Sequence, residues 1–498
     1  MKTVSCTRDV LRRAIVLCMM LLACVLHAAS LSDFAKPYSD LPFKTEPVNP
    51  PVIPDLTVSL ADYGGKGDGY TLNTEAFGRA LDDLEKRGGG HLVVTEGVWV
   101  TGPIAMRSNV DLHIVKDAII LFSPDKSLYP ILPPDEGTGG QLCTAPISAT
   151  HISNFSITGQ GIIDGNGEAW RPVKRFKVSD AEWAKMKRLG LREVTEEGRQ
   201  VYYPTVGNSD GNLHTKRPRL LRFIGCSNFM VQGVVVQNSP SFHVNMILCD
   251  HFILDGIMVR CPWNAQNGDG IDLSSCHHAL LTGCSVDAGD DAICMKSGIG
   301  DVGRSRGATH DIVIDGCTVF HGHGGFVIGS DTGGGMKDIM VRNCRFIDTD
   351  TGIRIKSGRD RGGLVSDVWI ENIVMCDIAD EAILFDCYYQ EKVGDARDVE
   401  AKPVTADTPR FRDVHIKDIV CTDAARAILV KGLPEMPVAN ITISDAVITA
   451  RSGAVINHAR DITLRDVTLV LPVGDAVTSH NAEGLVTPGL KIIELKNQ

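Results

Sequence analysis

The stretch HALLTGCSV at residues 278–286 recurs along the chain with different letters and one pattern. Apolar residues fall mostly at its positions 2, 4, 7 and 9. Position 6 is Gly, Asn or Asp in all nine copies, which begin at residues 228, 251, 278, 311, 338, 367, 413, 440 and 461. NFSITGQGI at 154–162 resembles a tenth copy. The alternation has the two-residue period of a half-buried strand, and its phase slips at position 6, where a turn residue lets the chain bend.

Most copies begin 21–33 residues after the preceding one. One unit of this size cannot bury its own apolar face, so neighbouring units must stack. The units are short strands broken by turns and show no helical period, which is typical of an all-β parallel β-helix whose coils rise by about 4.8 Å each. The sequence therefore predicts a single solenoid over residues 57–498, with a small capping segment at its N-terminal end.

The remaining segments divide the chain in a simple way. Residues 1–29 have basic residues, a short apolar run and HAAS, and are predicted to be a signal peptide. Residues 30–56 are Pro-rich and are expected to form an arm. Within 57–94 we expect a helix over residues 74–86, capped by Asn73 or Thr74, and then a strand from His91. Residues 168–218 interrupt the repeats as an insert with a short basic helix.

Composition narrows the function classes. The net charge of −11 argues against non-specific nucleic-acid binding. No segment after the N-terminal run could span a bilayer. From the predicted signal peptide we expect an exported protein: periplasmic, anchored in the outer membrane, or extracellular. Membrane attachment is expected only if Cys24 is lipidated. Nothing in the sequence indicates obligate oligomerisation, and we expect a monomer.

Twelve of the fifteen cysteines follow the leader, which holds Cys6, Cys18 and Cys24. Cys284, Cys317 and Cys344 occupy position 7 of consecutive copies, and we expect them to stack in a buried ladder as small apolar side chains. An even number of cysteines in an exported protein also invites disulfides between other pairs, which the sequence does not assign. No CxxC pair or His cluster has metal-ligand spacing, so neither a metal nor a cofactor is predicted.

Charged side chains gather in four consecutive coils of the predicted solenoid. Stacking places residues one coil apart side by side, and this brings together Asp269, Asp290, Asp291, His323, Arg354 and Lys356. Paired carboxylates in a groove are the usual apparatus of glycoside hydrolysis, where one carboxyl group stays protonated and another activates water. Like-charge neighbours raise the pKa of one carboxyl group. Two cations on one strand face indicate a substrate that carries a carboxylate.

At these residues the chain resembles glycoside hydrolase family 28, the polygalacturonase (pectinase) family, whose fold is a right-handed parallel β-helix. The resemblance covers roughly residues 57–470 and includes NSP at 238–240. All four family motifs (NxD, DD, GHG and RxK) are intact and in order, as Asn267-Gly268-Asp269, Asp290-Asp291, Gly322-His323-Gly324 and Arg354-Ile355-Lys356.

The resemblance implies hydrolysis of α-1,4-galacturonosyl bonds of pectin or oligogalacturonides with inversion at the anomeric carbon. Asp290 would be the general acid, and Asp269 and Asp291 would activate water. His323 would tune the acid or position the substrate. Arg354 and Lys356 would bind the galacturonate carboxylate, and Asn267 would shape the site. His243 and Tyr388 are weaker candidates for contact with the substrate. Inversion predicts carboxyl groups roughly 6.5–9.5 Å apart.

The insert at 168–218 could close one end of the groove, and residues 57–90 resemble the same region of bacterial exo-acting members. Both features favour release of sugars from a chain end. Three alternatives stay open. The first is a family-28 hydrolase of rhamnogalacturonan or xylogalacturonan. The second is a β-helical pectate lyase, which would use calcium and an Arg or Lys base. The third is a non-enzymatic carbohydrate-binding β-helix.

Overall fold

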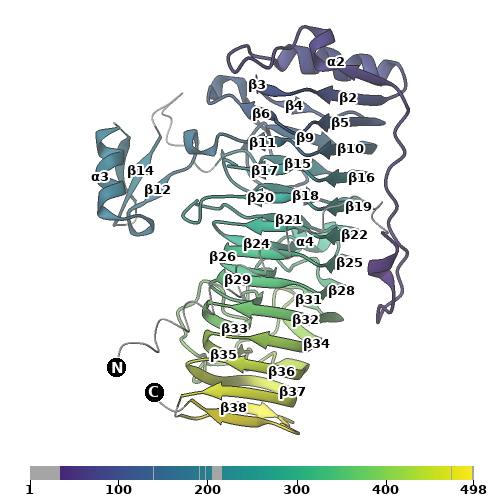
Figure 1. The fold of residues 1–498 in the computed structure, drawn as a ribbon. Helices are drawn as coiled ribbons and strands as arrows, with labels where there is room; N and C mark the ends of the chain where they lie inside the picture. Colours follow the sequence, from purple (N-terminus) through teal and green to yellow (C-terminus); the bar gives the residue numbers. More distant parts are fainter. Residues whose placement is uncertain are drawn as a thin grey trace, which may run out of the picture.

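A computed structural model of the chain describes residues 34–137, 139–189, 191–196, 198–204, 216–472 and 474–495. The predicted signal peptide, with Cys24, lies outside these residues. The described chain forms a right-handed parallel β-helix, which confirms the predicted fold (Figure 1). Its 34-stranded sheet pairs each strand with the strand one coil later. Three strands per coil give the solenoid three faces.

The first face is made by the first strand of each repeat. In the later coils this strand is longer and continues around the corner into the second face. It comprises β1 (Thr57–Ser59), β2 (Gly90–Val94), β5 (Val110–Ile114), β10 (Ser153–Gly159), β16 (Ser227–Gln232), β19 (Asp250–Asp255), β22 (His277–Thr282), β25 (Thr309–Asp315), β28 (Met336–Arg342), β31 (Leu364–Val365), β32 (Val368–Cys376), β34 (Arg410–Cys421), β36 (Val438–Thr449) and β37 (Ser452–Leu471).

The second face follows the position-6 bend of each repeat. It comprises β3 (Gly97–Thr101), β6 (Ala118–Phe122), β11 (Ile162–Asp164), β17 (Val235–Gln237), β20 (Met258–Arg260), β23 (Ser285–Asp287), β26 (Thr318–Gly322) and β29 (Arg345–Thr349), with β39 (Lys491–Glu494) on β37 at the far end.

The third face lies between successive repeats and was not visible as a pattern in the sequence. It comprises β4 (Ile104–Ala105), β9 (Ile147–Thr150), β15 (Leu221–Ile224), β18 (Val244–Ile247), β21 (Ile271–Ser274), β24 (Asp291–Lys296), β27 (Gly324–Ile328), β30 (Ile353–Lys356), β33 (Ile378–Asp386), β35 (Ala424–Lys431) and β38 (Val477–Glu483).

The bend at position 6 has the backbone geometry that its residue types favour. Gly283 and Gly316 there have φ of 59° and 70°, and Asn343 has φ of 58°. Position 1 of the repeats is also left-handed, as at Asn228 with φ of 50° and Asp311 with φ of 55°. Gly, Asn, Asp and His tolerate this region best, which explains why these residue types recur at both corners.

Inward-facing side chains stack coil upon coil. Phe229 lies 5.0 Å from Phe155 and 4.8 Å from Phe252, ring centroid to ring centroid, and both pairs are stacked. The cysteine ladder is confirmed, because Cys317 lies between Cys284 and Cys344 and all three are buried. All twelve cysteines of the described residues are free thiols, so the expectation of disulfides is wrong. Shape-matched neighbours, rather than covalent links, stabilise this core.

Helix α2 (Thr74–Lys86) closes the N-terminal end, as the helix prediction for 74–86 and the capping segment require (Figure 1). It buries Phe77, Leu81 and Leu84 over the first coil. Asn73 occupies the N-cap position but makes no side-chain cap. Its Oδ1 accepts instead from the backbone N–H of Lys66 at 2.7 Å. The predicted strand from residue 91 is β2.

The Pro-rich arm lies along the first face (Figure 1). Its Val48 packs on Ile253, Leu280 and Val313 of three successive coils. Arg342 on β28 donates to the carbonyl of Pro37, and Asn154 on β10 bonds both backbone groups of Val52. The arm therefore fastens several coils together.

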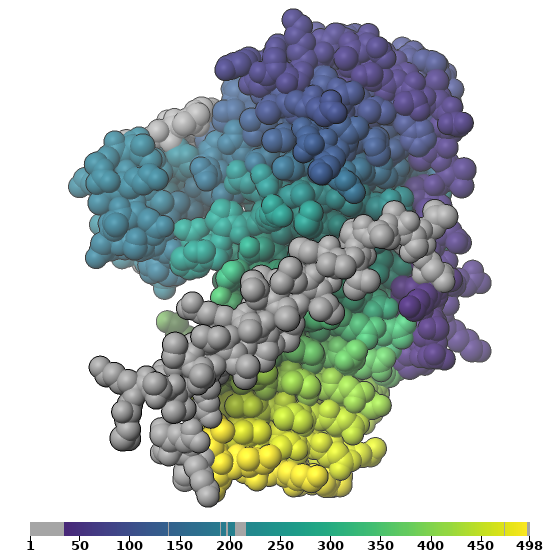
Figure 2. Space-filling view, in the orientation of Figure 1, coloured from purple at the N-terminus to yellow at the C-terminus, as the bar shows by residue number. Residues whose placement is uncertain are grey.

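The insert leaves the solenoid after β11 and forms a small lobe (Figure 2). It contains β12 (Val173–Lys174), β13 (Arg192–Glu196) and β14 (Arg199–Tyr203) in an antiparallel sheet, and α3 (Asp180–Arg188), the predicted basic helix. A third helix, α4 (Gly300–Arg306), follows β24. No described helix is long and apolar enough to cross a membrane.

Candidate active site

The predicted charged residues lie together on the third face. Asp269 precedes β21, Asp291 opens β24, His323 precedes β27, and Arg354 and Lys356 are on β30. These strands are consecutive in the sheet, with Asp291 in register with Gly324 and Val327 in register with Arg354. The stacking of coils therefore brings together residues that are 87 positions apart in the chain (269 to 356).

The Asp290-Asp291 pair stands at a crowded corner. A Cβ on Gly289 would lie 2.7 Å from the carbonyl oxygen of Ala265 and 2.8 Å from that of Pro262. Only glycine lets this turn lie directly against the loop that leads to Asp269. This close approach places the two coils' carboxylates side by side.

One carboxylate oxygen each from Asp269, Asp290 and Asp291 lies within 4.8 Å of the others. This spacing is closer than the separation that inversion was expected to give. Two hydrogen bonds of about 2.7–2.8 Å to one water span roughly this distance. The side chains of Asp269 and Asp291 are 6% and 5% exposed, whereas that of Asp290 is 20% exposed. The cluster thus has one accessible carboxyl group and two deep ones.

Two cations contact Asp291 directly. Lys356 Nζ lies 2.7 Å from Oδ2 and Arg354 Nη1 lies 3.5 Å from Oδ1. Burial raises the pKa of Asp291, but Lys356, Lys296 and Arg354 outweigh it and the pKa is held well below its usual range. Arg354 is less buried than Lys356 and also donates to the carbonyl of His323. Both cations face the cluster, as their spacing on one strand predicts.

Asp269 is the carboxyl group of the cluster whose pKa is raised. Burial, followed by the charges of Asp272 and Asp290, raises its pKa well above the usual value. Its Oδ1 has no hydrogen-bond partner among the described residues, and Lys296 Nζ, at 3.8 Å from Oδ2, is bound more closely to Asp272 at 2.8 Å. The sequence singled out neither Lys296 nor Asp272, although both lie in the strands of the predicted motifs.

Asp290 is paired with His323, whose Nδ1 lies 3.0 Å from Asp290 Oδ1. Burial raises the pKa of Asp290, but the hydrogen bond from His323 helps to bring it below the usual value. The same bond raises the pKa of His323. Like-charge repulsion therefore does not keep Asp290 protonated in the free protein. The His323–Asp290 pair holds the proton instead.

Asn267 shapes the loop below the cluster. It adopts φ of 54°, and its Oδ1 accepts from Nη2 of buried Arg217 at 2.9 Å. Arg217 also donates to the carbonyls of Pro240 and Gln266. Arg217 lies at the end of the insert and was not predicted. It ties the NSP and NGD segments together beneath the site.

His243 and Tyr388 were expected to contact substrate, but the structure gives both a packing role. His243 is fully buried, with Nδ1 2.9 Å from the carbonyl of Asp269 and Nε2 accepting from Ser239 N. Tyr388 is buried and donates its hydroxyl to the carbonyl of Gly432. The next residue, Tyr389, points to the other side, where Lys356 Nζ lies 5.3 Å from its ring. Tyr389 therefore brings an aromatic ring beside Lys356.

The insert contributes a cation that the sequence did not single out. Lys177 follows β12 and interacts electrostatically with Asp290 and Asp350. Burial lowers its pKa, and the two carboxylates oppose this. The accessible side of the cluster thus faces a lysine from the lobe as well as His323.

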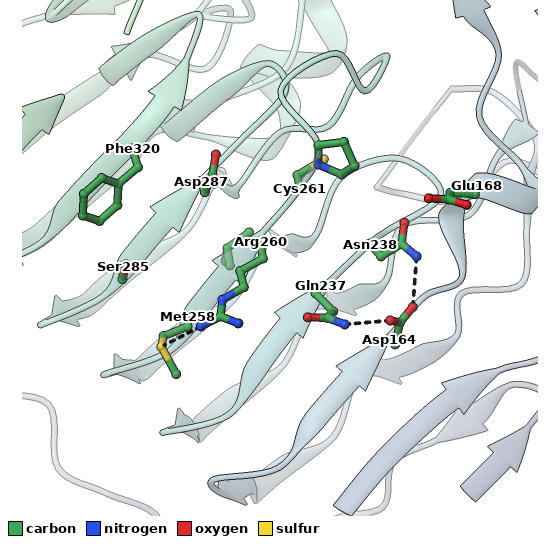
Figure 3. A pocket seen from close by; sticks show the side chains of 12 residues that line it. Asp164, Glu168, Gln237, Asn238, Met258, Arg260, Cys261, Ser285, Asp287 and Phe320 are labelled. Carbon is green, nitrogen blue, oxygen red and sulfur yellow. Dashed lines mark hydrogen bonds between the residues drawn. The ribbon is translucent and has the colours of Figure 1, made fainter. Parts of the chain in front are cut away.

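A cavity of about 490 Å³ lies on the second face (Figure 3). Its polar lining includes Asp164, Glu168, Arg260 and Asp287. Asp164 accepts a hydrogen bond of 2.7 Å from Gln237, drawn as a dashed line in Figure 3. The cavity contains none of the predicted catalytic residues, but Glu168 at its edge begins the insert and Asp287 lies three residues before Asp290. The cavity therefore lies next to the carboxylate cluster, across the corner between the second and third faces.

The three carboxylates could hold a metal ion by distance alone. Their surroundings do not suit calcium, which takes six to eight oxygen ligands. Asp291 is already neutralised by Lys356, and Lys296 stands beside Asp269. This donor set disfavours the calcium-dependent lyase alternative.

Comparisons with known proteins agree with the site. The sequence model of glycosyl hydrolases family 28 matches residues 136–463. A probable polygalacturonase of Vitis vinifera is 29% identical over 404 residues, covering 79% of this chain and 74% of the relative. The exo-poly-alpha-D-galacturonosidase of Dickeya chrysanthemi is 26% identical over 385 residues, 74% of this chain and 62% of that protein.

Two solved structures extend the likeness to the fold. The hyperthermoactive exopolygalacturonase of Thermotoga maritima superposes with a TM-score of 0.68 at 29% identity, covering 89% of this chain and 94% of the other. The family 28 exopolygalacturonase of Yersinia enterocolitica superposes with a TM-score of 0.70 at 21% identity, covering 87% and 78% of the two chains. The second comparison bears on the fold alone.

Proposed function

The chain belongs to glycosyl hydrolase family 28 and is a glycoside hydrolase, and from that premise we propose that it cleaves α-1,4-galacturonosyl bonds of pectin by inverting, exo-acting hydrolysis. The observation that supports this most is the graded burial of three carboxylates around two cations. Asp290 is accessible to a sugar, whereas Asp269 and Asp291 are nearly enclosed.

The chemistry follows from this arrangement. Asp290 transfers a proton to the glycosidic oxygen as the C1–O bond breaks, and it draws that proton from its partner His323. Asp291, kept ionised by Lys356, takes a proton from the attacking water. Asp269, with its raised pKa, orients that water. Because the deep carboxylates reach the sugar only through water, displacement inverts the anomeric carbon.

Arg354 is the cation best placed to bind the substrate carboxylate. Its side chain is 23% exposed, against 6% for Lys356, and its contact to Asp291 is the longer of the two. A guanidinium can bind a second carboxylate while it keeps the first. We therefore assign Lys356 chiefly to Asp291, and Arg354 to the galacturonate of the substrate.

The insert supports attack at a chain end. It brings Lys177 within electrostatic reach of Asp290. A lobe in this place blocks continuation of the sugar chain on one side, and its lysine can pair with the carboxylate of a terminal sugar. Similarity to the Thermotoga maritima exopolygalacturonase and to the Dickeya chrysanthemi exo-poly-alpha-D-galacturonosidase supports this proposal.

Product analysis on de-esterified polygalacturonic acid tests the proposal. We expect saturated galacturonate alone from the earliest times, with or without a chelator, and proton NMR should show the inverted β anomer first. A ladder of saturated oligomers would reject exo-action, and an α anomer would reject inversion. Unsaturated, chelator-sensitive products would indicate a lyase. Activity on rhamnogalacturonan or xylogalacturonan alone would support another family-28 substrate, and no product from any of these would leave only the binding role.

We also propose that the protein is exported as a monomer after removal of residues 1–29. Outer-membrane anchoring is proposed only if Cys24 is lipidated. Mass spectrometry of the mature N-terminus distinguishes cleavage after residue 29 from a lipidated Cys24. Light scattering of the purified protein tests the monomer.

A further inference from the structure

Histidines gather on the first face, away from the carboxylate cluster. Four histidines and two aspartates lie on three consecutive strands. They are Asp250 and His251 on β19, His277 and His278 on β22, and His310 and Asp311 on β25. In the sequence they are spread over 62 positions (250 to 311) and show no ligand spacing. The stacking of coils brings them to one place.

The repeat geometry explains why histidine is found here. Position 1 of each repeat needs a left-handed backbone, and His251 and His278 have φ of 52° and 49°. Histidine is among the residues enriched in that region. The preceding position is also in register, with Asp250 opposite His277 and His277 opposite His310. Two adjacent columns of His and Asp side chains therefore run along the start of the first face.

The nitrogen atoms converge on a single oxygen. Nδ1 of His251 and of His277 each lie 2.7 Å from Asp250 Oδ1, and Nδ1 of His278 lies 2.8 Å from it. His277 Nδ1 and His278 Nδ1 are themselves 3.1 Å apart. A hydrogen bond between these two Nδ1 atoms needs one of them to be an unprotonated acceptor. That acceptor nitrogen has no proton to donate to the Asp250 carboxylate, and the nitrogen and the carboxylate oxygen repel each other. Protons on neutral imidazoles cannot satisfy all four contacts together, whereas a cation accepts every lone pair.

We propose that Asp250, His251, His277 and His278 form a binding site for a divalent transition metal ion of the zinc type. Neutral imidazole and carboxylate are zinc's ordinary ligands, at about 2.0–2.2 Å in tetrahedral geometry. Ligand atoms about 3.3 Å apart satisfy that geometry. The three contacts of Asp250 Oδ1 need to lengthen by about 0.5 Å, and ligand atoms of Asp250, His251 and His278 lie within 4.8 Å of one another. Side chains that are 29–51% exposed can make this adjustment.

A second group supports the ligand orientation. Asp311 Oδ2 lies 3.9 Å from His278 Nε2 and also bonds His310 Nδ1 at 2.5 Å. Metal-bound histidines usually donate their other ring N–H to a carboxylate or carbonyl, which fixes the ring. Binding through Nδ1 of His278 leaves Nε2 facing Asp311 for this purpose.

The site has a structural consequence. Its ligands come from the coils of β19 and β22, and Ile253 and Leu280 on the same strands carry Val48 of the arm. A bound ion would clamp these two coils beneath the arm. The expected effect is on stability, because the carboxylates on the third face are not part of this cluster.

The test uses the full mature chain and zinc chloride as the probe. Isothermal titration should show one saturable equivalent, and the melting temperature should rise with zinc, as binding to the folded state alone requires. The His251→Asn, His278→Asn double variant should lose both effects. Asparagine is chosen because it keeps the left-handed backbone, as Asn228 does at the same repeat position.

A matched control replaces the two histidines around Asp111 on the same face, as His91→Asn, His113→Asn. This control and the Asp290→Asn variant should bind zinc like the wild type. Cobalt should give visible bands of a nitrogen and oxygen site without sulfur charge-transfer bands. The absence of saturable binding, or binding that survives in the His251, His278 variant, would overturn the proposal. Sulfur bands would assign the ion to a cysteine instead.

Discussion

His323 Nδ1 lies 3.0 Å from Oδ1 of Asp290, so the one accessible carboxyl group of the cluster shares its proton with a histidine. The bond lowers the pKa of Asp290 and raises that of His323 above its ordinary 6.5. The pair titrates as a unit, and the proton that leaves it at high pH is the one needed for the leaving oxygen.

Replacing His323 with Asn should move the alkaline limb of the pH–rate profile to lower pH. In the wild type, activity falls as pH rises through the raised pKa of the pair. In the variant, Asp290 alone must supply the proton to the leaving oxygen, and without the His323 partner we expect that proton to be lost at lower pH. The dependence of kcat/KM on pH measures this. An alkaline limb in the same place would contradict the shared proton.

Replacing Asp290 with Asn should lower kcat by about 10²–10⁴-fold, the usual contribution of a general acid, with little change in KM. Asp348→Asn is the matched control, because Asp348 makes the equivalent histidine contact with His321, 3.0 Å away on the second face. The control should keep activity within about twofold, since exposed ion pairs contribute little. Equal losses in both variants would show a structural effect and not an acid.

Replacing Lys356 with Met should cost about 3–5 kcal/mol of stability at neutral pH, because it leaves Asp291 as a buried charge with weaker pairing. The folded pKa of Asp291 lies below its ordinary 3.8, so its stabilising contribution is present above about pH 4 and is lost as pH falls through the folded value. The free-energy difference between wild type and variant should therefore shrink on acidification. Denaturant unfolding at several pH values measures it, and a pH-independent difference would contradict this ion pair.

Replacing Lys177 with Ala should raise KM for oligogalacturonides roughly tenfold, about the effect of one lost charge-assisted hydrogen bond. Lys185→Ala on α3 of the same lobe is the control, because its side chain is exposed and should leave KM unchanged. Steady-state kinetics with short oligomers provides the measurement. If Lys177→Ala leaves KM unchanged, the lobe does not contact the terminal sugar.

Much of the fold and of the site could be predicted from the sequence, because a solenoid turns repeat spacing directly into contact. The apolar alternation predicted the inward-facing residues, and the position-6 residues predicted the bend. The column from Asp269 to Lys356 followed from coil stacking and motif resemblance together. Helix α2 was predicted from its local pattern at the correct residues.

Only the tertiary structure decided which group holds which proton. Burial and the positions of Lys356, Lys296 and His323 set the pKa shifts of the carboxyl groups. These positions are differences of a few ångströms, which the amino-acid sequence does not specify directly. The same holds for Tyr388, which bonds the carbonyl of Gly432, for Tyr389, whose ring lies 5.3 Å from Lys356 Nζ, and for the histidines on the first face. The sequence by itself determined the repeat and hence the columns. The three-dimensional packing decided the partners within each column, because desolvation and charge contacts act through space.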